Sequence, residues 1–220
     1  MGKYPIMTFT KITGWPMYKL FFNYKIHYTG DASKTKYDRC PKKCIIIPNH
    51  THIFDALLVE HVFFRRMVRT ITAEVMFNKS PFFAWFLRKR GHIEVKRGER
   101  DKTTIENTKK ALEENTAVAV FAEGRLHKKG ETGILPFHPG AVMFAVQTHS
   151  PILLMYARAN YRFFKKTHVV LGEPIDVFEY IDTSKPIKEA AKEVCVMLRE
   201  RMCELEKKYM EIVGSESCKK

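Results

Sequence analysis

The stretch Cys44-Ile45-Ile46-Ile47-Pro48-Asn49-His50-Thr51-His52-Ile53-Phe54-Asp55 is the starting point for interpreting the chain. Its first five residues form a β-branched run that is typical of a buried strand, and residues 56–64 suit a helix. His50 is therefore expected at a strand-to-helix corner, just beyond the strand end. In α/β proteins, reactive groups are often placed in that position.

Within this corner, His50 and Asp55 are separated by four residues. A turn followed by the first helical turn can therefore bring the carboxylate to one nitrogen of the imidazole, while the other nitrogen faces the cleft. Such a carboxylate fixes the tautomer of the ring and stabilises the imidazolium that forms when the free nitrogen takes a proton. Because no serine or cysteine nucleophile is evident nearby, we predict that His50 acts as a general base directly on a substrate hydroxyl.

Two other interpretations fit the same residues. Asn49 or Thr51 could cap the helix by accepting hydrogen bonds from its first amides. Alternatively, His50, His52 and Asp55 are spaced like the start of a binuclear zinc motif. No further cluster of histidine and aspartate follows at ligand spacing, so we expect no metal.

The composition bounds the size of the fold and the class of partner. A chain of 220 residues with 45% hydrophobic content can build one sizeable α/β core, and not comfortably two. The net charge of +14, from 38 Lys+Arg against 24 Asp+Glu, predicts an anionic partner. A phospholipid surface, a phosphorylated substrate, an acidic carrier protein and nucleic acid all satisfy that requirement.

The cysteines and the apolar stretches indicate the compartment. The five cysteines are an odd number without zinc-type spacing, so we expect reduced thiols in the cytoplasm. The N-terminus lacks a signal-peptide pattern, and Lys or Arg interrupts each apolar stretch before the ~18 residues that a membrane span requires. We therefore expect any membrane contact to be peripheral, on the cytoplasmic face.

Apolar runs and amphipathic segments alternate along the chain. The pattern predicts strands at residues 24–28, 44–48, 70–75, 92–95, 116–121, 151–156 and 167–174, and helices at 56–64, 81–87, 101–113, 141–147 and from 185 onward. Pro81 suits the first position of its helix, and Asp101 or Thr103 could cap the next one. This alternation predicts a single α/β domain with a mixed, mostly parallel central sheet flanked by helices. The last helix is long and amphipathic, with a core-facing stripe that runs from Ile187 to Ile212.

The N-terminal segment mixes aromatic residues with lysines throughout residues 4–28. That mixture suits a segment at a membrane interface, with rings at headgroup level and ammonium groups near phosphates. A helix or strand that covers the core explains the same pattern equally well. We expect a turn at 30–34 and divide the chain into an N-terminal segment (1–30), a domain (31–213) and a frayed tail (214–220).

Two further polar clusters follow predicted strand ends. Lys96-Arg97-Gly98-Glu99-Arg100 could be a phosphate clamp or simply a solvated charged loop. The second cluster is Ala122-Glu123-Gly124-Arg125. Glu123 is either a surface-loop residue or a pocket carboxylate, Gly124 lets the backbone approach a ligand, and Arg125 could bind a phosphate with both arms of its guanidinium.

Four blocks in this order resemble those of the glycerophospholipid (lysophospholipid) acyltransferase family, which includes the 1-acylglycerol-3-phosphate acyltransferases. Residues 49–55 match an Asn-His-x-x-x-x-Asp block, and residues 91–97 resemble a second block that carries a substrate-binding arginine. Residues 121–124 resemble Phe-Pro-Glu-Gly, with Ala122 in the place of proline. Residues 150–154 resemble an apolar strand opened by proline. Arg125 stands where threonine is common, which leaves the acceptor headgroup open.

The resemblance implies an O-acyltransferase. His50, oriented by Asp55, would remove the proton from a glycerol hydroxyl of 1-acylglycerol 3-phosphate as that oxygen attacks the thioester of acyl-ACP or acyl-CoA. Arg97, Glu123, Gly124 and Arg125 would bind the acceptor, with Glu123 contacting a hydroxyl or ordering the arginines. The co-substrate is the thioester, and no bound cofactor is implied.

Three alternatives remain. The same fold could acylate glycerol 3-phosphate, a headgroup-bearing lysophospholipid or an aminoacyl lipid. The charge also suits a nucleic-acid-binding module, but no recognition pattern for nucleic acid is present, so we expect none to bind. A catalytically inactive membrane-binding protein is a third reading, against which the presence of both His50 and Asp55 argues.

Overall fold

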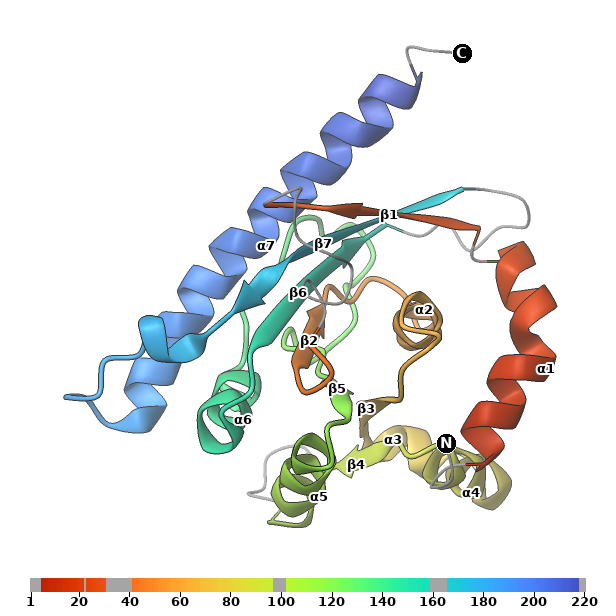
Figure 1. Ribbon diagram of the computed structural model, residues 1–220, viewed down its shortest axis with the longest axis horizontal. Helices are drawn as coiled ribbons and strands as arrows, with labels where there is room; N and C mark the ends of the chain where they lie inside the picture. The colour runs from red at the N-terminus through yellow and green to blue at the C-terminus, as the bar shows by residue number, and fades with distance from the viewer. Residues whose placement is uncertain (1–4, 22, 31–40, 97–101, 159–165, 218–220) are drawn as a thin grey trace.

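The apolar runs form a seven-stranded sheet at the centre of the computed structural model (Figure 1). The structure describes residues 5–21, 23–30, 41–96, 102–158 and 166–217, without the side chains of residues 15, 17–21, 216 and 217. The strands are β1 (Tyr24–Tyr28), β2 (Ile45–Pro48), β3 (Val68–Ala73), β4 (Ile93–Val95), β5 (Ala117–Ala119), β6 (Ile152–Ala157) and β7 (Thr167–Ile175). Their order across the sheet is β1-β7-β6-β2-β5-β3-β4.

Neighbouring strands are parallel throughout this sheet, except for the antiparallel pair β6 and β7. The predicted mixed, mostly parallel sheet is therefore confirmed. Parallel neighbours require crossover connections, and helices supply them here. The helices are α1 (Pro5–Phe21), α2 (Asp55–Val62), α3 (Glu74–Phe77), α4 (Pro81–Lys89), α5 (Lys102–Glu113), α6 (Gly140–Thr148) and α7 (Ile187–Ser217), with a 3-10 turn, η1, at Val177–Glu179.

The three isoleucines of β2 divide the core into two layers. Ile45 and Ile47 pack with residues of α5, α6 and α7, whereas Ile46 faces the opposite way and packs with α2. Side chains alternate between the two faces of a strand, so one buried strand serves both layers. All three isoleucines are fully buried. Helices therefore cover both faces of the sheet, as Figure 1 shows for α7 and α2.

Several predicted boundaries are wrong. The strand predicted at 70–75 begins at Val68 and ends at Ala73, and Glu74 starts α3 instead. Thr103 lies inside α5 and is not its cap, while Asp101 falls outside the described residues. The tail predicted from residue 214 is still helical as far as Ser217. Ile187 is 47% exposed, so the core-facing stripe of α7 starts later.

Other local expectations are confirmed. Pro81 is the first residue of α4, and the side chain of Ser80 caps that helix by accepting a hydrogen bond from the amide of Phe83. From Ala191 to Tyr209 the predicted apolar stripe of α7 is buried. The turn expected at 30–34 lies, apart from Gly30, outside the described residues.

Helix α1 has one side turned to the core and another turned to solvent. Met7 and Lys11 are buried against the body of the protein, whereas Phe9 and Ile12 are 65% and 60% exposed. One side of the helix therefore covers the core while another carries bare apolar side chains. Across the described ranges, no helix has both the length and the hydropathy to cross a membrane.

Candidate active site

His50 lies where the sequence predicts, beyond the end of β2 and before α2. Nδ1 of its ring is 3.3 Å from Oδ2 of Asp55, the first residue of α2. The same oxygen accepts hydrogen bonds of 2.7 Å from the amides of Thr51 and His52. Because the carboxylate can only accept from Nδ1–H, this contact leaves the lone pair of Nε2 available to act as a base.

The capping interpretation of this corner is wrong. The N-cap position of α2 is Phe54, and no side chain caps the helix there. Asn49 instead exchanges two 2.9 Å hydrogen bonds with the backbone of Ala157, at the end of the neighbouring strand β6. Asn49 thereby fixes the chain direction just before His50. In the described part of the chain, no three His, Cys, Asp or Glu residues are grouped to hold a metal ion.

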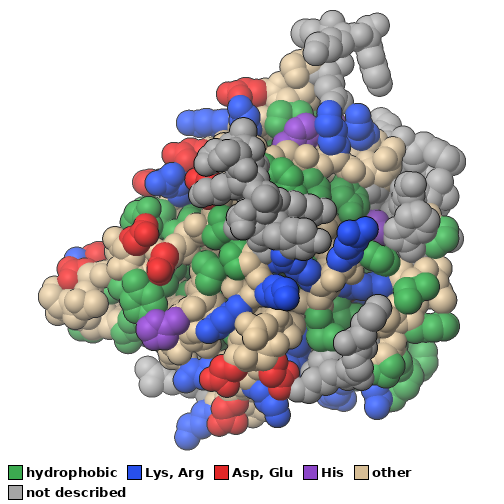
Figure 2. All heavy atoms as spheres, in the orientation of Figure 1, with side chains coloured by type: hydrophobic (Ala, Val, Ile, Leu, Met, Phe, Trp, Pro, Cys, Tyr) green, Lys and Arg blue, Asp and Glu red, His purple; other side chains and the backbone are tan. Residues whose placement is uncertain are grey.

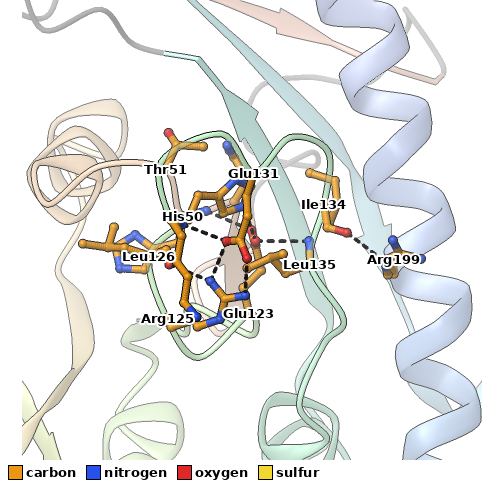
Figure 3. Close-up of polar contacts among 12 residues, drawn as sticks. His50, Thr51, Glu123, Arg125, Leu126, Glu131, Ile134, Leu135 and Arg199 are labelled. Atoms are coloured by element: carbon orange, nitrogen blue, oxygen red, sulfur yellow. Dashed lines mark hydrogen bonds and ion pairs between the residues drawn. The ribbon is translucent and has the colours of Figure 1, made fainter.

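Glu123 ties a second strand end to the histidine loop. It follows β5, which is a parallel neighbour of β2, and it is only 3% exposed. Its Oε1 accepts a 2.9 Å hydrogen bond from the backbone amide of His50, and its Oε2 accepts from His127 Nε2 at 2.7 Å and from the Leu135 amide at 3.2 Å (Figure 3). Glu123 is therefore a buried carboxylate, and protein donors occupy both of its oxygens.

Aromatic and backbone contacts hold this loop in place. The ring of Phe121 stacks on the imidazole of His50, with the ring centroids 3.9 Å apart. Gly124 has a φ of +71°, and a β-carbon at that position would lie 2.6 Å from the ring of His138. Glycine is therefore required both for the backbone conformation and for space. From the far side, Arg199 of α7 donates a 2.9 Å hydrogen bond to the carbonyl of Ile134 (Figure 3).

Arg125 is placed differently from the expected phosphate ligand. Its guanidinium makes a two-armed ion pair with Glu131, at 2.6 and 2.9 Å. The hydrogen bonds from Arg125 and from the Lys128 amide lower the pKa of Glu131 to about 2, and Glu131 in turn raises the pKa of Arg125. The side chain of Arg125 is 41% exposed beside the loop, so it can still reach a ligand if the pair opens.

The structure thus brings His50, Asp55, Glu123 and Gly124 together beyond the carboxyl ends of β2 and β5, with Arg125 beside them. Arg97 lies outside the described residues, so the predicted clamp has no place in this description. Sequence reasoning missed His127, Glu131 and Phe121. The four-residue spacing between Glu123 and His127 is the one local signal that indicates a contact. The contacts of Phe121 with His50 and of Glu131 with Arg125 depend on how the loops fold.

Comparisons with known proteins give sequence matches to acyltransferases. A family model described as Acyltransferase matches residues 26–157. The 1-acyl-sn-glycerol-3-phosphate acyltransferase of Saccharomyces cerevisiae is 29% identical over 139 residues, which cover 61% of this chain and 43% of that protein. The human 1-acyl-sn-glycerol-3-phosphate acyltransferase beta is 25% identical over 177 residues, 79% of this chain and 62% of the relative.

A solved structure shares the fold. The 1-acyl-sn-glycerophosphate (LPA) acyltransferase PlsC from Thermotoga maritima superposes with a TM-score of 0.56 at 19% identity, and the match covers 89% of this chain and 79% of that one. The match therefore extends beyond the four sequence blocks to most of the described architecture. The two sequence relatives, by contrast, are matched over less than two thirds of their own length.

Proposed function

Because this chain belongs to the acyltransferase family, we propose that it transfers a fatty acyl group from a thioester to the free hydroxyl of 1-acylglycerol 3-phosphate, giving phosphatidic acid. The donor is acyl-ACP or acyl-CoA. The observation that carries the proposal is the His50–Asp55 pair, set at a strand end and tied by Glu123 to the neighbouring strand end. The two relatives whose names state this acceptor lend it further support.

In the proposed reaction His50 Nε2 takes the proton of the acceptor hydroxyl while that oxygen attacks the thioester carbonyl. A tetrahedral oxyanion forms, and its collapse breaks the C–S bond. The imidazolium then returns the proton to the departing thiolate, so that a thiol and an ester leave the site. Asp55 stabilises the imidazolium between these two steps, and base assistance of this kind contributes ~10²–10⁴ in rate.

Glu123 acts in this scheme as a positioning residue. Protein donors engage both of its oxygens, so its part is to fix the backbone of His50 rather than to bind the acceptor hydroxyl. We assign the acceptor phosphate to Arg97 and Arg125. For Arg125 this requires exchange of the Glu131 carboxylate for the phosphate, and both are anions that suit a two-armed guanidinium contact.

We also propose that the enzyme works as a peripheral protein on the cytoplasmic face of a membrane. The bare apolar side chains of α1 and the net charge of +14 support an anionic lipid surface as the partner. A lysophospholipid acceptor resides at such a surface, so this location would bring the site to its substrate.

The test is an acyl-transfer assay that offers lysophosphatidic acid, glycerol 3-phosphate and lysophosphatidylethanolamine as acceptors with a labelled thioester. We expect lysophosphatidic acid to react fastest. His50→Ala should abolish turnover, while His52→Ala, which removes an exposed ring from the same loop, should retain it. Full residual activity of His50→Ala would remove the base from the mechanism. Preference for an acceptor without a phosphomonoester would refute the assigned acceptor and leave the chemistry intact.

A further inference from the structure

A second site lies between α1 and the turn that leads into β3. It is a hollow of about 390 Å³, within the size range of small-molecule sites. Its lining residues come from one face of α1 and from the turn, and they are Met7, Thr8, Lys11, Ile12, Phe64, Arg65, Arg66 and Met67. Backbone hydrogen bonds from Phe64 to His61 and from Arg66 to Phe63 give the turn a defined shape.

The charge of this hollow is entirely positive. Lys11, Arg65 and Arg66 line it, and no carboxylate is among the lining residues. The nearby acid is the buried Glu60, which is already paired with Arg90 and with His92 Nε2 at 3.3 Å. Glu60 is therefore committed elsewhere, and the hollow keeps a net attraction for anions.

Lys11 is the central cation. It is only 8% exposed, and its Nζ donates a 2.8 Å hydrogen bond to the carbonyl of Arg66. An ammonium has three donors, so this bond leaves capacity for an oxygen of a ligand. Burial lowers the pKa of Lys11 to about 8, because the charged form is poorly solvated there. A bound anion would stabilise the charged form of Lys11 in place of the water that burial has removed.

Apart from Thr8, the uncharged lining residues of the hollow are apolar: Met7, Ile12, Phe64 and Met67. Ile12 lines the hollow and is also 60% exposed, so it lies at the mouth of the hollow. Phe9 of α1 is also exposed, and helix α4, which contacts α1, exposes Phe82 and Trp85, whose rings stack 5.9 Å apart. In Figure 2 hydrophobic side chains gather along the edge where Figure 1 places α1 and α4.

This hollow is separate from the candidate active site. His50 follows the carboxyl end of β2, whereas residues 64–67 precede the amino end of β3. Both strands run parallel to β5 and therefore to each other. The two sites consequently lie at opposite ends of the sheet, separated by about 20 Å, the length of a six-residue strand such as β3.

We propose that this hollow binds the phosphate headgroup of an anionic membrane phospholipid, with Lys11 and Arg65 on the phosphate and the acyl chains over the exposed apolar residues of α1 and α4. The cations select an anion, and the apolar walls favour a lipid over a soluble phosphate. The site would hold the enzyme on the bilayer by a lipid that it does not transform. This role is independent of the acyl-transfer chemistry.

The experiment measures binding of the full chain to monomeric dihexanoyl phosphatidylserine, which is not an acyl acceptor, by calorimetric titration. Dihexanoyl phosphatidylcholine, which has no net charge, and glycerophosphoserine, which has no acyl chains, serve as comparison probes. We expect measurable binding of dihexanoyl phosphatidylserine alone. Lys11→Met should weaken it about tenfold or more, as expected for loss of a charge-assisted hydrogen bond, and Arg65→Gln should weaken it less because Arg65 is exposed.

Lys79→Gln is the matched control, because it removes one charge from an exposed position before α4 and should leave binding unchanged. Ile12→Glu places an acid at the mouth of the hollow without touching the core, so it tests the site if Lys11→Met does not fold. Equal weakening by Lys79→Gln would reduce the effect to net charge and overturn the site. Equally tight binding of glycerophosphoserine or of phosphatidylcholine would overturn the lipid or the anion assignment. Turnover of short-chain soluble substrates, measured in parallel, should be unchanged in Arg65→Gln.

Discussion

His50 is held from three directions by groups with different chemistry. Asp55 contacts Nδ1, Phe121 covers one face of the ring, and Glu123 accepts from the backbone amide. In the proposed mechanism the imidazole must be within hydrogen-bond reach of the proton that it removes, so its orientation matters as much as its affinity for protons. Substitutions around the ring should therefore act mainly on the turnover number, even where they leave the ring itself intact.

Gly124 gives the sharpest test of that loop. In Gly124→Ala the positive φ costs about 1–2 kcal/mol, and displacement of the His138 ring by the new β-carbon adds about 1–3 kcal/mol. We expect a lower unfolding free energy in urea and a reduced turnover number, because Glu123 and the amide of His50 move with the loop.

Gly133→Ala is the matched control for this substitution. Gly133 has a φ of +78°, and a β-carbon there meets nothing within 4 Å. It should therefore carry only the backbone cost and keep full turnover. If the two variants lose the same stability and activity, the contact with His138 has no role in shaping the site.

The ion pair between Arg125 and Glu131 predicts how the acceptor constant can be tuned. If Arg125 must leave Glu131 to bind phosphate, Glu131→Gln should lower the KM for lysophosphatidic acid about twofold to fivefold, the modest effect expected when an exposed ion pair is removed. Arg125→Gln should raise the same KM with little change in kcat. Steady-state kinetics on both variants decides, and a higher KM in Glu131→Gln would mean that the pair holds the loop in its binding form.

The sequence predicts some of these residues and not others, for physical reasons. The spacing of His50 and Asp55 is short enough for one turn to bring them together, so their contact follows from local geometry. Arg125 looked like a free phosphate ligand because its partner Glu131 lies across a loop whose path no local pattern determines. The sequence does not decide whether Glu123 is a surface or a buried residue, because burial depends on which strands become neighbours.

Among the elements, β1 lies at its predicted residues, 24–28, and two strands with pure apolar runs lie within one residue of their predicted ends, whereas the run predicted at 116–121 forms a strand only at Ala117–Ala119. Ile45–Pro48 and Ile152–Ala157 are buried on both faces and show no competing pattern. Element ends are harder. Glu74 and Val75 continue the alternation of β3, yet the chain turns there into α3, which buries Phe77. That gain is a tertiary effect, and it outweighs the β-propensity of Val75.

His61 in helix α2 should make the free energy of unfolding depend on pH. Burial, assisted by the charge of Lys11, lowers the pKa of His61 to about 4 from an ordinary value of 6.5. Between these values the unfolded chain binds a proton that the folded chain does not, so stability falls as the pH falls. We expect His61 alone to reduce the unfolding free energy by about 2 kcal/mol between pH 7 and pH 5.

His61→Gln isolates this contribution, since glutamine does not titrate. Urea unfolding of both proteins at the two pH values gives the comparison, and the variant should lose about 2 kcal/mol less than the parent. Burial raises the pKa of Glu60, but its contacts with His92 and Arg90 lower the pKa overall, so protonation of Glu60 also destabilises the fold in acid. This effect is common to both proteins. Identical losses in the two proteins would mean that His61 is protonated as readily in the fold as in the unfolded chain.

At the scale of the whole molecule, one continuous sheet connects the helices packed on its two faces. It continues from β1 beside β7 to β4 beside β3, and helices cover both of its faces. On one side, α1 reaches α4 while Lys11 bonds to the turn before β3. Buried contacts therefore cross the boundary at residue 30 that we drew from sequence between the N-terminal segment and the domain.

This continuity predicts that the chain unfolds as one cooperative unit. Tryptophan fluorescence reports α1 and α4, through Trp15 and Trp85, while far-ultraviolet circular dichroism is dominated by all the helices together. The two urea transitions should coincide, as required when no intermediate is populated. Trp15→Phe and Trp85→Phe leave one reporter each, so that α1 and α4 can be followed separately. A fluorescence change of Trp15 that precedes the loss of circular dichroism would instead make residues 1–30 a unit that detaches before the sheet melts.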